Sequence, residues 1–410
     1  MALHNPEGMT DIINGKCYLK KAKEEEIRKL FLSSGFNEIE TPCMEYFDMY
    51  YGDNEYIRQE DIFKFTDKTG KLLVLRPDMT VPACRVAATK MKGPLPYKLS
   101  YIEKCYRAND FGGGKQREFT QCGAEILGSS DAYYDAESIR LAVKTAKAVG
   151  IADISVQIGQ VEFFSGLAKA AGFCKAECEK ISKLIDNKDN FGIEEFLNTH
   201  ETEPSIRKHL SSLTGYIGGS EMLLKLKADP LNERSLKAVM NLSEILDILK
   251  EMGIDQLVSI DLSMVKKLGY YTGMIFSGMT YKMGFPILAG GRYDNLCGKM
   301  GKTLPATGFS LSMEMAMQAL ERQGYEYASQ AENTVITFTK ETRSAVLKKA
   351  ASIKGDFEIL ADSDDAVLYC KDKGAYRLIR CISENEVTVE EKDNKKKVMT
   401  LAKWSEKWNI

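Results

Sequence analysis

The stretch from Pro96 to Gly128, PYKLSYIEKCYRANDFGGGKQREFTQCGAEILG, decides the fold class of this chain. Apolar and polar side chains alternate on both sides of the glycine-rich segment NDFGGGKQR, a pattern typical of two β-strands joined by a hairpin loop. The stretch DAESIRLAVKTAKAVG follows with the spacing of an amphipathic helix, starting at an Asp and ending at Gly150. Antiparallel strands backed by a helix predict an α+β fold and argue against a doubly wound parallel sheet.

The rest of the chain divides into a large first part and a small second part. IFKFTD and KLLVLRP predict another hairpin, with its turn at Asp67 to Gly70. From about residue 160 to 250 the pattern is helical, and strand patterns return after it, so a helical block interrupts one sheet. We therefore predict a core over residues 1–325, with the helical insertion at about 160–250, and a small C-terminal α/β domain over 330–410.

The composition is that of a soluble globular protein. The 410 residues are 44% hydrophobic and 28% charged, with a net charge of −2, so no global positive field attracts nucleic acid or an anionic membrane. No apolar run reaches the roughly 18 residues of a membrane span, and the N-terminus lacks the apolar segment of a signal peptide. We expect a cytoplasmic protein that does not bind membranes.

Cysteines and histidines give no sign of a metal site or a catalytic triad. The ten cysteines are scattered without a C-x-x-C pair, which favours reduced, buried thiols over disulfides or metal ligation. The sequence has only three histidines, so a histidine-based triad or zinc site is not expected. We expect no metal and no cofactor.

The second strand of the opening stretch carries a polar pair on one face. Side chains alternate between the two faces of a strand, so Gln121, Gly123 and Glu125 lie together. If that face is buried, the amide and the carboxylate need partners, because an unpaired buried polar group costs about 1–3 kcal/mol. Gly123 would then leave room for a ligand. The pattern equally allows that the face is exposed to solvent.

Charged residues nearby have both a functional and a structural interpretation. Arg107 could pair with a carboxylate of the protein or with one of a ligand. Lys115 and Arg117 follow three glycines and could bind phosphate together with backbone amides, although such glycines also form ordinary hairpin loops. Asp78, in LRPDMT, could equally cap a helix, and AGGRYD could be a tight turn.

Taken in order, these segments resemble the catalytic core of histidyl-tRNA synthetase, a class II aminoacyl-tRNA synthetase. GFNEIETPCME is similar to the first class motif, through which that family forms dimers. LRPDMT, CYRAND…KQREFTQCGAEILG, LGYYTG and AGGRYDNL are similar to the second class motif and to the histidine-specific segments. The resemblance runs from about residue 5 to 322 and implies an antiparallel sheet with flanking helices.

The resemblance implies roles for residues at the polar end of the amino acid. Asp78 and Thr80 match positions that hold the amino group of histidine. Arg107 matches the arginine near the amino-acid carboxylate and the ATP α-phosphate. Lys115 and Arg117 are candidates for residual phosphate contacts.

The resemblance also implies contacts to the rest of the ligand. Gln121 and Glu125 match further histidine contacts, in agreement with the shared strand face. Tyr270 and Tyr271 match the tyrosine pair that lines the imidazole pocket. These residues complete the predicted histidine site.

Departures from the synthetase pattern fall on the ATP side. Active synthetases read Arg-Gly-Leu-Asp before the tyrosine pair, where this chain has Lys266, Lys267 and Gly269 at the changed positions. Lysine keeps a charge but lacks the planar fork that grips carboxylate and phosphate together. Met315 stands where an arginine packs on the adenine ring in the family, and methionine supplies no cation. The resemblance therefore implies a binding protein without catalytic residues.

A relative that keeps the histidine pocket and loses adenylation resembles the regulatory subunits of ATP phosphoribosyltransferase. LSSLTGYIGGSEMLLKLKA and SIDLSMVKKLGYYTGMIF are similar to segments of that family. The resemblance implies a non-catalytic subunit that binds L-histidine, activates the short-form catalytic subunit in the first step of histidine biosynthesis and mediates feedback inhibition.

The same resemblance implies self-association as a dimer and a larger assembly with the catalytic partner. The nearly neutral C-terminal part argues against tRNA binding. Two alternatives stay open. One is a divergent histidyl-tRNA synthetase, and the other is a histidine-sensing paralogue with a different partner.

Overall fold

The chain forms two compact units in a computed structural model. The first comprises Met1–Asp11 and Ala22–Tyr325, and the second comprises Ile12–Lys21 and Glu326–Ile410. The predicted domains, at 1–325 with an insertion and at 330–410, stay a prediction. The structure describes residues 4–51, 57–109, 115–265, 270–325, 334–352, 357–362, 364–373, 377–391 and 395–407.

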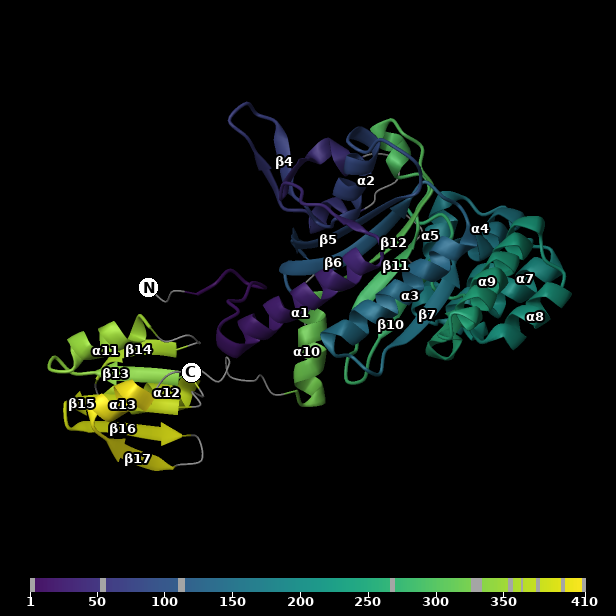
Figure 1. Ribbon diagram of the computed structural model, residues 1–410. Helices are drawn as coiled ribbons and strands as arrows, with labels where there is room; N and C mark the ends of the chain where they lie inside the picture. Colours follow the sequence, from purple (N-terminus) through teal and green to yellow (C-terminus); the bar gives the residue numbers. More distant parts are fainter. Residues whose placement is uncertain are drawn as a thin grey trace. The chain divides into compact units, whose positions relative to one another are not determined.

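A nine-stranded mixed sheet is the framework of the first unit (Figure 1). Every neighbouring pair from β5 to β7 is antiparallel, whereas β1 and β9 pair in parallel with β5 and β7. The α+β fold with an antiparallel centre is therefore confirmed. The strands in spatial order are β1 (Asn37–Glu38), β5 (Tyr97–Tyr106), β6 (Glu118–Leu127), β12 (Ala306–Ser312), β11 (Leu288–Arg292), β10 (Met274–Met279), β7 (Ser155–Gln160), β9 (Val258–Asp261) and β8 (Ile217–Gly218).

The central hairpin predicted from the opening stretch is confirmed as the pair β5–β6. Tyr101 lies opposite Gly123, and Tyr106 lies opposite Glu118. β6 is buried from Thr120 to its end, because it has β5 and β12 on its two edges and helices on its faces. The helices that contact it are α2 (Thr80–Thr89), α3 (Ala132–Val149) and α10 (Met313–Gln323).

Helix α3 ends where the sequence predicts and begins earlier. Gly150 closes it with a φ of 116°, a backbone conformation that favours glycine. The predicted start at Asp135 is wrong, since the cap is Asp131, whose carboxylate accepts a hydrogen bond from the Tyr133 N–H at 2.8 Å. Asp135 lies inside the helix and forms an ion pair with Arg292. Two aspartates four residues apart look alike in a local pattern, and only their tertiary partners distinguish them.

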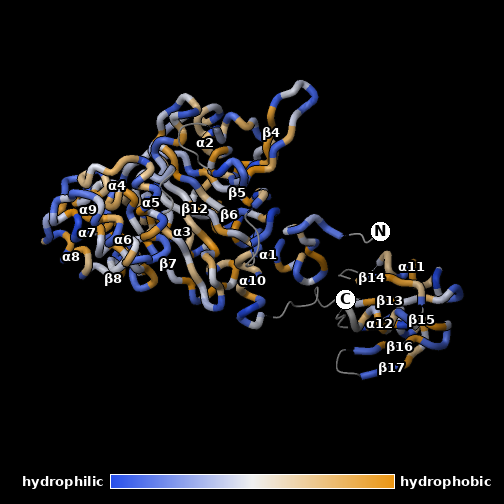
Figure 2. Tube along the Cα trace, turned by 180° about the vertical axis from the view of Figure 1, so that it is seen from behind, coloured by the Kyte–Doolittle hydropathy of each residue, from blue (hydrophilic) through white to orange (hydrophobic). Residues whose placement is uncertain are grey.

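Helices occupy the segment between β7 and β9 and lie together at one end of the sheet (Figure 1). Hydrophobic and hydrophilic residues alternate along them, as expected for helices with one buried face (Figure 2). α9 packs on both α4 and α3, which joins this helical layer to the core. These helices are α4 (Val161–Ala170), α5 (Lys175–Asp186), α6 (Asn190–Asn198), α7 (Pro204–Ser211), α8 (Ser220–Ala228) and α9 (Glu233–Glu251).

The second predicted hairpin is confirmed within a small three-stranded sheet. β4 (Leu72–Leu75) is its central strand, flanked by β2 (Met44–Tyr46) and β3 (Lys64–Thr66). The turn between β3 and β4 is held by Asp67, whose carboxylate accepts hydrogen bonds from two backbone N–H groups. Helix α1 (Asn14–Ser33) precedes this sheet.

The second unit contains a five-stranded mixed sheet with helices between the strands, which is the predicted α/β pattern. Its elements are β13 (Thr334–Phe338), α11 (Arg343–Ala350), β14 (Phe357–Ala361), α12 (Asp364–Lys373), β15 (Arg377–Ser383), β16 (Glu386–Glu391), β17 (Lys396–Met399) and α13 (Leu401–Lys407). Within the described part of the chain, no helix has both the length and the apolar character needed to span a bilayer.

Candidate amino-acid-binding site

Glu125 is the centre of the candidate site. Its side chain is buried, with 1% of its surface exposed, which excludes the alternative that this face of β6 is open to solvent. One carboxylate oxygen accepts hydrogen bonds from the Tyr101 hydroxyl at 2.9 Å and the Thr80 hydroxyl at 3.1 Å. The other accepts a hydrogen bond from the Tyr293 hydroxyl. Three hydroxyls from separate parts of the fold therefore converge on one carboxylate.

Burial gives Glu125 an unusual titration. Desolvation raises the pKa of its carboxyl to about 7, although the three hydroxyl donors oppose the shift. The charge of Asp78 raises this pKa further. A carboxyl with such a pKa changes its ionisation near neutral pH, so a bound cation would favour its charged form.

Glycines shape the space around this carboxylate. Gly308, on β12, lies opposite Glu125, and a Cβ added there would overlap the second carboxylate oxygen. A Cβ added at Gly123 would lie 2.5 Å from the Tyr101 hydroxyl. The sequence interpretation that Gly123 leaves room for a ligand is therefore corrected, because the Tyr101 ring occupies that space.

The start of α2 supplies the neighbouring polar groups. The Met79 N–H donates to the side-chain oxygen of Gln121 at 3.0 Å, which orients this amide on β6. The Asp78 carboxylate is 4% exposed and accepts a hydrogen bond from the Val81 N–H at 3.4 Å. Met79 is the N-cap residue of α2, so Asp78 lies one residue before the cap and accepts from the first turn, while its charge acts on the pKa of Glu125.

The predicted tyrosine pair lies beside these groups. The rings of Tyr270 and Tyr271 are 4.1 Å apart between centroids and inclined by 32°, and Tyr270 also lies 5.7 Å from the Tyr293 ring. Burial raises the pKa of Tyr271 to about 12, and the charges of Glu125 and Asp78 add to the shift. The structure therefore brings the tyrosine pair and the two carboxylates together.

Arg107 approaches the same site from the end of β5. Its Nε donates to the Pro77 carbonyl at 3.2 Å, next to Asp78, and its guanidinium lies over the Phe119 ring at 5.6 Å. Its positive charge lowers the pKa of Tyr271, which places it within electrostatic reach of the tyrosine pair. Six further residues of the predicted set share this region with it: Asp78, Thr80, Gln121, Glu125, Tyr270 and Tyr271.

The predicted phosphate contacts have other partners. The Arg117 guanidinium donates to the Glu7 carbonyl at 3.2 Å, and its backbone N–H donates to the Gly8 carbonyl at 2.7 Å. Lys115 lies over the Phe285 ring at 5.2 Å. A role for Lys115 and Arg117 in phosphate binding stays a prediction.

Of the positions that depart from the synthetase pattern, Met315 lies among the described residues. Lys266, Lys267 and Gly269 lie outside the described residues. Met315 is near the start of α10, where its N–H donates to the Ser312 hydroxyl at 3.4 Å, and its side chain is 4% exposed. Its thioether is thus part of the packed interior.

Two tyrosines of the site were missed by the sequence analysis. Tyr293 lies in the quoted AGGRYD segment, so that segment was a usable signal. Tyr101 lies on a strand whose alternation gives no reason to prefer it over its neighbours. Its importance follows from the register of β5 with β6, which places it opposite Gly123.

A buried ion pair holds the residue that precedes Tyr293 in the chain. The Arg292 guanidinium pairs with Asp135 of α3 at 3.0 Å, and it also donates to the Ser129 carbonyl at 3.0 Å and to Asp294 at 3.1 Å. Burial raises the pKa of Asp135, and Arg292 partly offsets that shift. Arg292 therefore fixes the backbone from which Tyr293 projects.

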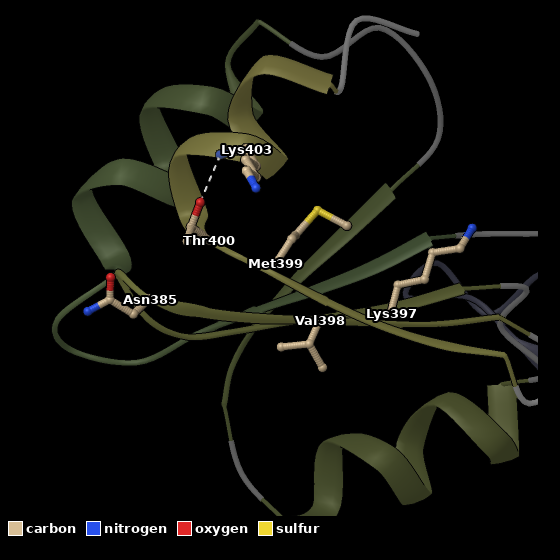
Figure 3. A pocket seen from close by; sticks show the side chains of 6 residues that line it. All are labelled: Asn385, Lys397, Val398, Met399, Thr400 and Lys403. Atoms are coloured by element: carbon tan, nitrogen blue, oxygen red, sulfur yellow. Dashed lines mark hydrogen bonds between the residues drawn. The ribbon is translucent and has the colours of Figure 1, made fainter.

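Other features of the molecule do not add to the site. Each of the ten cysteines is a free thiol. Among the described residues, no group of three or more metal-ligating side chains is placed to hold an ion. A hollow of about 540 Å³ in the second unit has two lysines, and no carboxylate, among the described residues of its wall (Figure 3). Its lining residues are Asn385, Lys397, Val398, Met399, Thr400 and Lys403.

Sequence comparison connects this chain with two groups of proteins. The family model for histidyl-tRNA synthetase matches residues 8–316. An ATP phosphoribosyltransferase regulatory subunit from Acetivibrio thermocellus is 40% identical over 400 residues, and one from Ruminiclostridium cellulolyticum is 41% identical over 394 residues. Each match covers 94% of this chain and 94% of the relative.

Solved structures agree with the sequence comparison. A protein from Bacillus halodurans described as an ATP phosphoribosyltransferase regulatory subunit/histidyl-tRNA synthetase has a TM-score of 0.81 at 28% identity, covering 93% of this chain and 99% of that one. Histidyl-tRNA synthetase from Nostoc has a TM-score of 0.79 at 19% identity, covering 99% and 98%. The second likeness shows the fold alone.

Proposed function

Because this chain belongs to the ATP phosphoribosyltransferase regulatory subunits, within the histidyl-tRNA synthetase family, we propose that it binds L-histidine around Glu125 and controls a catalytic phosphoribosyltransferase chain. The observation that supports histidine binding is the buried Glu125 carboxylate, which accepts hydrogen bonds from three hydroxyls and lies beside a tyrosine pair. Burying a carboxylate costs free energy unless it is paired or hydrogen-bonded. Buried carboxylates with a raised pKa occur preferentially at functional sites. A small amino acid with cationic groups suits such a site.

The chemistry of the site matches the parts of histidine. The carboxylates of Asp78 and Glu125 suit the ammonium group and the imidazole N–H groups. The faces of Tyr270 and Tyr271 suit the flat imidazole ring, and Arg107 suits the α-carboxylate, since a guanidinium binds carboxylate with paired hydrogen bonds. These assignments follow the family resemblance residue by residue.

We propose that the chain has no catalytic residues of its own. The family arginine that packs on adenine is replaced by Met315, whose side chain is packed in the interior. Burial of an uncharged thioether at that point offers no cation to a nucleotide. The role left to the protein is to bind histidine and to act through another chain.

Regulation requires two assembly states that bind histidine with different affinity, because a ligand with equal affinity for both shifts nothing. We propose that the protein activates the short-form catalytic subunit in one state, and that histidine favours the other. A dimer of this chain, joined with the partner in a larger cytoplasmic assembly, is the expected form.

The test is phosphoribosyltransferase activity of the short catalytic chain from the same organism, measured with and without this protein while histidine is titrated. We expect activity only when both chains are present, and a fall in activity as histidine rises. Activity that does not depend on this protein would contradict the proposed partner.

A divergent histidyl-tRNA synthetase is the second candidate, favoured by the family model over residues 8–316. Histidine-dependent exchange between ATP and pyrophosphate separates the two. Clear exchange would rule out the non-catalytic proposal. If the chain binds histidine but supports neither phosphoribosyltransferase activity nor pyrophosphate exchange, the remaining hypothesis is a histidine-sensing paralogue with another partner.

Glu125→Ala is expected to weaken histidine binding at least about tenfold at pH 8, because a hydrogen bond to a charged group contributes about 1.5–3 kcal/mol. The advantage of the wild type should shrink below about pH 7, since the pKa of the Glu125 carboxyl is raised to about 7 and protonation removes its charge. Isothermal titration calorimetry measures histidine affinity for both proteins at each pH. The ratio of the two affinities removes the contribution of the ligand's own imidazole, which titrates equally in both experiments.

Glu118→Ala is the matched control for this prediction. Glu118 lies on the same strand, but its carboxylate pairs with Lys104 near the surface. Removing it should leave histidine affinity unchanged at every pH. Equal affinity of the wild type and the Glu125→Ala protein would place the ligand elsewhere.

A further inference from the structure

The hydroxyl of Tyr50 is a buried polar group without a hydrogen-bond partner among the described residues. Tyr50 follows the short helical turn Phe47–Met49 and has 2% of its surface exposed. Burying a hydroxyl without a partner costs free energy, so such a group calls for an explanation.

Tyr50 belongs to the same packed cluster as the tyrosines of the candidate site. The cluster contains Tyr293, and Tyr270 and Tyr271 pack against it. The charge of Asp78 acts on the pKa of the Tyr50 hydroxyl, so this hydroxyl lies within electrostatic reach of a carboxylate of the candidate site.

Burial and two nearby carboxylates act together on the pKa of this hydroxyl. Burial raises the pKa of Tyr50, and the charges of Asp78 and then Glu45 raise it further, while Arg76 opposes them. The phenol therefore stays neutral and protonated. Glu45 is paired with Arg85 at 2.6 Å, so Asp78 is the carboxylate left to act with this oxygen. A neutral oxygen near Asp78 suits a cationic N–H donor, whereas an anionic group would be repelled there.

We infer that the Tyr50 hydroxyl is a further ligand contact, whose oxygen accepts a hydrogen bond from the cationic amino group of the bound amino acid beside Asp78. This inference rests on the proposed histidine site. An ammonium group has three N–H donors, so the carboxylate of Asp78 and the hydroxyl of Thr80 leave one of them without an acceptor. Tyr50 supplies the third acceptor.

The contact has a consequence for regulation. Tyr50 lies in the segment that follows β2, whereas Asp78 precedes α2. A ligand bound to both would connect the small three-stranded sheet with the helix that presents Thr80 to Glu125. Occupancy of the site would thereby restrain the position of the β2 segment.

The test compares Tyr50→Phe with Tyr97→Phe, the same chemical change at two places in one cluster. The Tyr97 hydroxyl is also buried in that cluster but has partners, since it accepts a hydrogen bond from Lys302 at 3.0 Å and contacts two backbone carbonyls. Three probes are titrated calorimetrically: L-histidine, histidinol, which lacks the carboxylate, and imidazolepropionate, which lacks the amino group.

Tyr50→Phe is expected to weaken histidine and histidinol about tenfold and to leave imidazolepropionate unchanged, because only the first two carry the amino group. Its unliganded unfolding temperature should be unchanged or higher, since the variant removes an unpaired buried hydroxyl. Tyr97→Phe should do the opposite, with a lower unfolding temperature and wild-type histidine affinity.

Unchanged histidine affinity in Tyr50→Phe would overturn the inference and leave an ordered water as the partner of the hydroxyl. Equal losses for all three probes would overturn the assignment to the amino group. If the wild type itself binds no histidine, the proposed function fails. These three results are therefore distinguishable.

Discussion

Gly308→Ala is expected to weaken histidine binding about a hundredfold and to lower the free energy of unfolding by about 3 kcal/mol. Gly308 lies opposite Glu125 in the β12–β6 register, and a Cβ there would overlap the Glu125 carboxylate and approach the Ala124 carbonyl to 2.6 Å. The strand is central and buried, so the backbone has little freedom to move away. The carboxylate must therefore turn and lose hydroxyl partners.

Calorimetric titration with histidine and urea denaturation measure the two effects. Gly298→Ala is the control, because a Cβ there would meet its nearest neighbour, the Thr303 hydroxyl, only at 3.8 Å. This control should retain wild-type binding and stability. Full binding by Gly308→Ala would mean that the position of the Glu125 carboxylate does not matter for the ligand.

Arg292→Met is expected to lower the free energy of unfolding by about 3–5 kcal/mol, because it leaves the buried Asp135 without its cation. The pair joins β11 to α3, and the two side chains are 8% and 1% exposed. Since Arg292 also fixes the backbone before Tyr293, histidine binding should weaken in the same variant. Denaturant unfolding monitored by circular dichroism measures the loss.

A double variant separates the charge from the packing. Asp135→Leu added to Arg292→Met should recover a large part of the stability, since no uncompensated buried charge remains. Arg234→Met is the control, because Arg234 pairs with Glu162 at the surface and such pairs contribute about 1 kcal/mol or less. A loss no larger than in this control would show that Asp135 finds another partner.

Much of the fold could be predicted because its signals are local. The alternation in the stretch from Pro96 to Gly128 predicts β5 and β6, and Gly150 predicts the end of α3. The start of α3 could not be fixed in this way. Asp131 and Asp135 are both acceptable caps, and the choice depends on Arg292, which is 157 residues away from Asp135 along the chain.

By itself, the sequence determined the α+β class and the shared face of Gln121 and Glu125, because backbone geometry sets side-chain alternation within one strand. The tertiary structure decided what that face contacts. The hydroxyls that reach Glu125 come from positions 45, 24 and 168 residues away, and Gly308 shapes the space beside it. Such partners follow from strand register and helix packing, which depend on the whole sheet at once and leave no mark in any short stretch of sequence.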